Sequence, residues 1–138
     1  MAPLTVFLDA NVLFSAALGG PAFQLIRELG RRGRIRLVTS AHCRIEAAAN
    51  LERKRPRSAP RLGRVLSEVG LAPEPPSEAL ASARGLVAEK DAPVLAAALA
   101  ARADVLVTGD LKHFGALMDR ADLPLRVRSP RAFLLEGP

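Results

Sequence analysis

The stretch Val105-Leu106-Val107-Thr108-Gly109-Asp110 decides the interpretation of the whole chain. A run of aliphatic residues that ends in a polar triplet is typical of a buried parallel strand with an acid at its carboxyl end. Near the N-terminus, Thr5-Val6-Phe7-Leu8-Asp9 follows the same pattern. Because ligands of open α/β sheets bind outside the carboxyl ends of the strands, the two aspartates predict an acidic pocket at one edge of a sheet.

Further strands and helices alternate along the chain between these two stretches. We expect the other strands at residues 35–39 and 125–127, helices over 22–32, 41–54, 61–69, 78–84 and 91–101, and short helical segments after Asp110 and Ser129. Alternating strands and helices imply right-handed crossovers and a parallel sheet covered on both faces. The sequence therefore predicts an α/β fold, a three-layer α/β/α sandwich with a mostly parallel central sheet, as a single domain over residues 1–138.

Composition limits the classes of protein to which the chain can belong. With 138 residues, 49% of them hydrophobic, one domain can bury a core without disulfides. The single cysteine, Cys43, cannot close an intramolecular disulfide, and no signal peptide is visible, so we expect a reducing, cytoplasmic setting. No apolar run approaches the roughly 20 residues that span a bilayer.

The charge balance favours a polyanionic partner. Twenty Lys and Arg against 14 Asp and Glu give a net charge of +6, and nucleic acid is the commonest polyanion in a cell. An Arg-rich compositional bias is the alternative explanation. One basic run, suited to a phosphate backbone or simply solvated, comprises Arg53, Lys54, Arg55, Arg57, Arg61 and Arg64. Lys112 either contacts substrate phosphate near Asp110 or is merely exposed.

Four acids occupy positions that such a fold can bring together. Asp9 and Asp110 leave strand ends, Glu46 lies in the helix after the second strand, and Asp91 begins the helix before the central strand. Carboxylates that share a small pocket repel one another, so the cluster persists mainly where a cation neutralises it. Oxygen ligands without a set of Cys or His select Mg²⁺ or Mn²⁺, and such an ion activates water for phosphodiester cleavage.

Each acid also has a purely structural explanation. Asp9 can form an Asx-turn, Asp91 and Asp110 can cap helices, and a helical Glu46 is usually solvated. Their joint occurrence favours a site. His42 and His113 lack the spacing of zinc ligands, and we expect them to be surface or packing residues.

Two segments resemble the PIN domain, a family of metal-dependent ribonucleases. They are Phe7-Leu8-Asp9-Ala10-Asn11-Val12-Leu13, and Lys90 to Ala98 followed by Ala103 to Asp110. The resemblance extends from about Thr5 to Phe133 and is strongest to bacterial PIN proteins classed as toxins of toxin–antitoxin pairs.

The resemblance implies a catalytic ring of four acids that binds one or two divalent cations. Its members are Asp9, Glu46, Asp91 and Asp110, with Asn11 and Thr108 orienting the carboxylates. Glu46 fits the family's order of strand, Ser, helix and Glu, but the residues after it are alanine-rich. If that helix is rotated, Glu46 faces water and the site has three acids.

These features predict an endoribonuclease that uses Mg²⁺ or Mn²⁺ to hydrolyse RNA. The resemblance further implies a cognate antitoxin and a homodimer. The alternatives are a catalytically silent module that binds nucleic acid or protein, and a phosphoryl-accepting α/β domain. The last requires a second acid beside Asp9, and position 11 is Asn.

Overall fold

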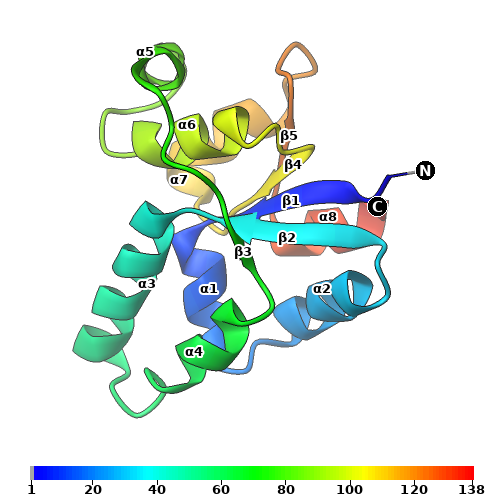
Figure 1. Cartoon of the computed structure of the whole chain (residues 1–138). Coiled ribbons are helices and arrows are strands. Elements are labelled where there is room, and N and C mark those ends of the chain that lie inside the picture. The colour runs from blue at the N-terminus through cyan, green and yellow to red at the C-terminus, as the bar shows by residue number, and fades with distance from the viewer. Residues whose placement is uncertain (1) are drawn as a thin grey trace.

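A five-stranded parallel sheet forms the centre of the computed structural model, which describes residues 2–138 (Figure 1). Its strands are β1 (Leu4–Leu8), β2 (Ile35–Thr39), β3 (Gly70–Leu71), β4 (Val105–Val107) and β5 (Arg126–Arg128). Their order across the sheet is β3-β2-β1-β4-β5, and every recorded pairing is parallel.

Helices cover both faces of this sheet. They are α1 (Ala10–Ala17), α2 (Pro21–Arg31), α3 (Ala41–Lys54), α4 (Arg61–Leu66), α5 (Ser77–Arg84), α6 (Ala92–Ala100), α7 (Leu111–Met118) and α8 (Pro130–Glu136). In Figure 1, α5 and α6 lie on one side of the sheet, and α1, α2 and α4 lie on the other. The predicted three-layer α/β/α sandwich is confirmed. Within residues 2–138, no helix combines the length and the apolar character that a membrane span needs.

Two elements differ from the sequence prediction because local patterns hide them. Helix α1 was not predicted, because only the short polar stretch Asp9-Ala10-Asn11 separates the hydrophobic run of β1 from the hydrophobic residues of the helix. The start of α1 is set by Asp9, whose side chain accepts a hydrogen bond from the Ala10 N–H. Strand β3 has only two residues, and its pairing with β2 defines it, so no periodicity can reveal it.

Smaller differences concern the ends of elements. Helix α4 ends at Leu66 rather than at residue 69, and the turn that follows leads directly into β3. Strand β5 begins one residue later than expected, and the last helical segment, α8, is seven residues long.

The core is built from strands that are buried on both faces and from a helix of small residues. All three residues of β4 are completely buried, as are Val6, Phe7 and Leu8 of β1. Five consecutive residues of α6, Val94 to Ala98, are at most 4% exposed. The alanines among them let the helix backbone pack closely on its neighbours.

The register of the sheet places the polar ends of the strands together. Leu8 pairs with Val107, so Asp9 and Thr108 leave neighbouring strands at the same level. The Asp9 N–H donates to the Val107 carbonyl at 3.0 Å, which fixes the backbone of Asp9 against β4. Strand β2 ends beside them with the buried pair Thr39 and Ser40.

Candidate active site

An open cleft of about 600 Å³ lies at this edge of the sheet. Its walls come from the starts of α1, α6 and α7 and from one side of α3. The polar side chains that line it are Asp9, Asn11, His42, Glu46, Asn50, Lys54, Lys90, Asp91 and Asp110. The structure thus brings the four predicted acids to one cleft, although they are up to 101 residues apart in the sequence.

Asp9 is the most firmly held of the four acids. It is 5% exposed, and its Oδ2 accepts hydrogen bonds from Thr108 Oγ1 at 2.7 Å and from Asn11 Nδ2 at 3.2 Å. Burial raises the pKa of Asp9 above its usual 3.8, the hydrogen bonds oppose this rise, and the nearby charge of Asp110 adds to it. The turn-forming role of Asp9 is present as well, since its Oδ1 accepts from the Ala10 N–H at 2.7 Å.

Asn11 and Thr108 lie where residues that orient the carboxylates would have to lie. The Asn11 Oδ1 accepts from the Gly109 N–H at 2.7 Å, and its amide nitrogen also donates to Thr108 Oγ1 at 3.3 Å. Thr108 Oγ1 accepts in turn from the Asp110 N–H at 3.1 Å. Gly109 allows this close approach, because a Cβ at this position would lie 3.2 Å from Asn11 Oδ1. This network connects Asp9 to the loop that carries Asp110.

Asp91 occupies the N-cap position of α6, but its side chain makes no capping hydrogen bond. The expected structural role of this carboxylate is therefore not fulfilled. Asp91 is 8% exposed, and its Oδ2 is buried without a hydrogen-bond partner among residues 2–138. A buried carboxylate oxygen without a donor is costly, and a cation is the partner that would satisfy it.

Asp110 is bound on both oxygens by one residue, His113. Its Oδ1 accepts from the His113 backbone N–H at 3.0 Å, and its Oδ2 lies 2.6 Å from His113 Nδ1. Burial alone would raise the pKa of Asp110, but the contacts with His113, helped by the charge of Lys90, lower it below 3.8. His113, which we expected to be a surface or packing residue, also holds the Asp110 carboxylate.

Asp91 and Asp110, which line the cleft, form a close group of potential metal ligands with His113. One ligand atom from each lies within 4.8 Å of the other two. The sequence signal for His113 was its position three residues after the helix-capping Asp110, a spacing that brings a side chain back to its cap. A zinc motif is defined by the spacing between several His or Cys residues, so it does not include the spacing between a capping Asp and one His.

Glu46 lines the cleft but stands apart from the tight group. Its side chain is 50% exposed, and its nearest recorded polar partner is His42 Nε2 at 3.8 Å. No hydrogen bond or ion pair is recorded between Glu46 and Asp9, Asp91 or Asp110 (the three inner acids) within residues 2–138. Glu46 therefore lies at the rim of the cleft.

The predicted RNA-binding residues are spread more widely than the acids. Of the predicted set, Lys54 lines the cleft, whereas Arg53, Arg55, Arg57 and Lys112 are exposed and outside its described lining. Lys90, which the sequence analysis did not select, does line the cleft.

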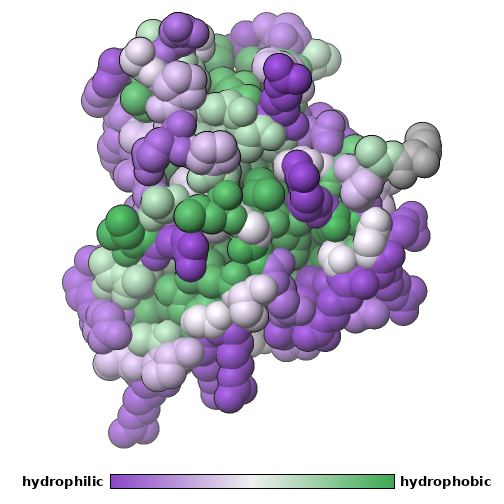
Figure 2. Space-filling view, in the orientation of Figure 1, coloured by the Kyte–Doolittle hydropathy of each residue, from purple (hydrophilic) through white to green (hydrophobic). Residues whose placement is uncertain are grey.

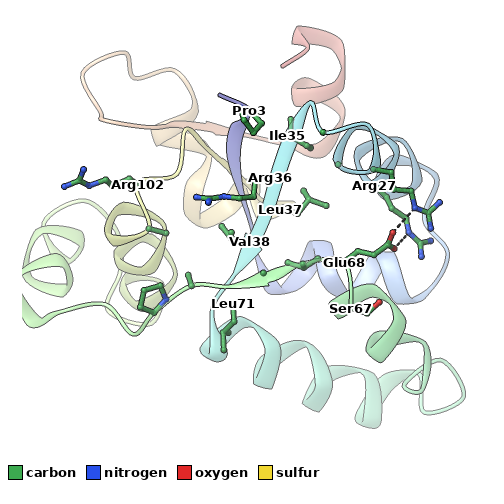
Figure 3. Close-up of a pocket in the computed structure, with 18 of the residues that line it drawn as sticks. Pro3, Arg27, Ile35, Arg36, Leu37, Val38, Ser67, Glu68, Leu71 and Arg102 are labelled. Carbon is green, nitrogen blue, oxygen red and sulfur yellow. Dashed lines mark hydrogen bonds and ion pairs between the residues drawn. The ribbon is translucent and has the colours of Figure 1, made fainter. Parts of the chain in front are cut away.

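A second hollow, of about 970 Å³, runs along β2 and β3 (Figure 3). Its floor appears as a green, apolar band across the face shown in Figure 2. The one carboxylate in its described lining is Glu68, which Arg27 and Arg31 of α2 already bind. The larger hollow therefore lacks the acidic chemistry that the smaller cleft concentrates.

Comparison with known proteins agrees with the fold. The sequence model of the PIN domain matches residues 5–112. The chain belongs to the PIN domain family. No curated protein matches this PIN domain significantly.

Two solved structures share the fold of this PIN domain. One is a chain of VapBC2 from Rickettsia felis, bound to a DNA fragment from the promoter, with a TM-score of 0.70 and 16% identity over 91% of this chain and 98% of that one. The other is a chain of VapBC-1 from nontypeable Haemophilus influenzae, with a TM-score of 0.63 and 18% identity over 93% of this chain and 99% of that one.

PIN domains generally use a divalent metal ion, and the residues present fit one. Three carboxylates supply hard oxygen donors, the Asp91 Oδ2 lacks a partner in the described chain, and a ring nitrogen lies among the ligand atoms. No pair of thiolates is available, because the chain has one cysteine.

Proposed function

We propose that this PIN domain is an endoribonuclease that depends on Mg²⁺ or Mn²⁺, and that it is the toxin of a toxin–antitoxin pair. Membership in the PIN domain family supports a nuclease role. The observation that carries the proposal is the buried Asp91 Oδ2, which has no hydrogen-bond partner among residues 2–138 and lies near Asp110 in the cleft that Asp9 also lines.

Asp9, Asp91 and Asp110 would hold the cation, with Glu46 as a ligand from the rim. When bound, the ion activates water as the nucleophile and stabilises the negative charge that develops on the phosphoryl oxygens. Thr108 and Asn11 hold the Asp9 carboxylate in one orientation through their hydrogen bonds.

Lysines at the cleft would bind the RNA backbone. Lys54 and Lys90 both line the cleft and are exposed, so their ammonium groups can approach phosphates on either side of the scissile bond. The exposed residues Arg53, Arg55, Arg57 and Lys112 would extend this contact beyond the cleft. We favour single-stranded RNA as the substrate. Proteins recognise double-stranded RNA mostly by its shape, and exposed, flexible lysines do not form a rigid surface that fits a duplex.

The proposed partner is an antitoxin that covers the acidic cleft. The two structural neighbours come from VapBC complexes, which supports a protein partner for this chain as well. A cytoplasmic location and a homodimer complete the proposal.

The test is RNA turnover with Mn²⁺ by the wild type and by the Asp9→Asn and Asp110→Asn variants. We expect each variant to lose at least 100-fold in rate, since each removes a carboxylate that holds the ion. Asp119→Asn is the matched control, because Asp119 is exposed and lies outside the described lining of the cleft. Equal rates for all four proteins would refute the nuclease assignment. RNA binding that weakens with salt, without cleavage under any divalent cation, would instead support a silent binding module.

A further inference from the structure

We propose that His113 is a direct ligand of the cation, so that this PIN domain has a mixed nitrogen and oxygen site that prefers Mn²⁺ to Mg²⁺. The inference rests on the part of the proposed function that places a cation between Asp91 and Asp110. It does not depend on RNA being the substrate.

The first reason is the position of the imidazole. His113 lies on the first turn of α7, and its ring points back to the helix cap, where Nδ1 meets Asp110 Oδ2 at 2.6 Å. The ring is 26% exposed, and Asp110 is the only hydrogen-bond partner recorded for it in the described chain. The ring is therefore held beside the Asp110 carboxylate and has no recorded hydrogen bond to another element of the described chain.

The second reason is that three donor groups converge. One ligand atom each from Asp91, Asp110 and His113 lies within 4.8 Å of the other two. A small divalent ion holds its ligands at roughly 2.1 Å, so two ligands on opposite sides of it are separated by about 4.2 Å. On binding, the ion would displace the proton that His113 Nδ1 and Asp110 Oδ2 share, and the three donors would move to its bonding distance.

The third reason is independent of the histidine. Asp91 Oδ2 is buried and has no donor in residues 2–138, although Asp91 is placed where a capping bond was available. A cation between Asp91 and Asp110 would satisfy this atom. His113 is the next donor within reach of that position.

The donor set then determines which ion is favoured. Carboxylates bind Mg²⁺ and Mn²⁺ alike, but Mg²⁺ strongly prefers oxygen, whereas transition metals accept imidazole nitrogen. A nitrogen ligand therefore adds affinity for Mn²⁺ that it does not add for Mg²⁺. If His113 only held Asp110 in place, its removal would weaken both ions by the same factor.

The histidine content of the chain makes a spectroscopic test possible. The chain has only two histidines, and the other, His42, also lines the cleft, near Glu46. Pulsed EPR on the Mn²⁺-loaded full chain detects coupling between Mn²⁺ and a directly bound ¹⁴N nucleus. We expect this coupling in the wild type and in His42→Gln, and its loss in His113→Gln.

Calorimetric titration of the same three proteins with Mn²⁺ and with Mg²⁺ gives the second readout. We expect His113→Gln to weaken Mn²⁺ binding by about 10-fold or more and Mg²⁺ binding by less than about threefold, whereas His42→Gln, which can act only through Glu46, should change the two affinities by the same factor. Absence of ¹⁴N coupling in the wild type would overturn the proposal without using any variant. Equal losses of Mn²⁺ and Mg²⁺ affinity in His113→Gln would also overturn it.

The outcomes separate this inference from the nuclease assignment. A ¹⁴N coupling without RNA cleavage would support the histidine ligand and refute only the nuclease. RNA cleavage with Mn²⁺ but without ¹⁴N coupling would refute only the histidine ligand.

Discussion

The cluster of acids should make the metal-free protein less stable than it would be without one of them, and Asp91→Asn tests this directly. Asp91 is buried, its Oδ2 has no hydrogen-bond partner within residues 2–138, and it contributes no capping bond to α6. Replacing it with Asn keeps the shape of the side chain and removes the charge. The substitution therefore removes a repulsion while giving up no recorded bond of Oδ2.

The size of the effect follows from the separation of the charges. Ligand atoms of Asp91 and Asp110 lie within 4.8 Å of each other. Coulomb's law at that distance gives about 0.9 kcal/mol in water and about 3.5 kcal/mol at an effective dielectric of 20. Since His113 offsets part of the charge of Asp110, we expect a gain near the lower end, about 1 to 2 kcal/mol. For a domain of 138 residues the melting temperature should then rise by roughly 3 to 7 °C.

The assay is thermal unfolding, first in EDTA and then with Mn²⁺. In EDTA at neutral pH and low salt, Asp91→Asn should melt above the wild type, whereas Asp119→Asn, the same change on the exposed surface, should shift the midpoint little. Mn²⁺ at 100 times its dissociation constant should stabilise the wild type by about 2.7 kcal/mol and the variant much less, so the order reverses. A variant that melts below the wild type in EDTA would refute the reasoning, because the carboxylate would then be a structural group.

Three further predictions concern other parts of the molecule. Burial raises the pKa of the Cys43 thiol from 9.0 to about 12, so the contribution of the neutral thiol to stability is complete below pH 9 and is lost as the pH rises towards 12. A thiol reagent at pH 8 should therefore label Cys43 only when the protein is in denaturant. Labelling at the same rate without denaturant would contradict the burial of this side chain. Burial would raise the pKa of Glu68, but hydrogen bonds from two arginines of α2 lower it below 4.5. Glu68→Gln should therefore lower the free energy of urea unfolding at pH 7 by about 1 kcal/mol, and this loss should shrink as the pH falls below 4.5. A loss of the same size at low pH would exclude the ion pairs as its cause. Gly109→Ala places a Cβ 3.2 Å from Asn11 Oδ1 and should therefore displace the Asn11 side chain. RNA turnover should fall at least 10-fold, with a small loss of stability. Full turnover would instead show that the hydrogen bond between Gly109 and Asn11 is dispensable.

The sequence predicted the buried strands well because their signal is local. The continuous hydrophobic runs that end at Leu8 and Val107 require burial on both faces, and that requirement specifies a central position in a parallel sheet. The same reasoning failed for α1, whose hydrophobic residues after Asp9 and Asn11 resemble those of the preceding strand although they are helical. It failed for β3 because two residues acquire their extended form from pairing with β2.

The sequence predicted that the four acids would meet at one cleft, but it did not predict which neighbouring side chains would contact them. Asp9 and Asp110 are placed by strand ends, which topology brings together without reference to side chains. The orientation of Glu46 depends on how α3 rotates over the core, and the alanines after it leave that rotation unspecified in the sequence. His113 was missed because its contact is with a helix cap, whereas the zinc criterion looks for other ligands at fixed spacing.

The hydrogen bonds of the three inner acids indicate where a cation would bind most strongly. Asp9 accepts four hydrogen bonds, from the Ala10 N–H, Asn11 Nδ2, Thr108 Oγ1 and the Cys43 thiol, and these oppose the rise in its pKa that burial causes without cancelling it. The charge of Asp110 is compensated by His113 on both oxygens, whereas Asp91 Oδ2 has no donor in the described chain. Judged by hydrogen bonds, the unmet demand for positive charge is therefore greatest at Asp91 Oδ2. Because a buried charge without a partner lowers stability, and no bond to Asp91 Oδ2 is recorded within residues 2–138, the proposed ion would give the carboxylate at position 91 the partner that the fold does not supply.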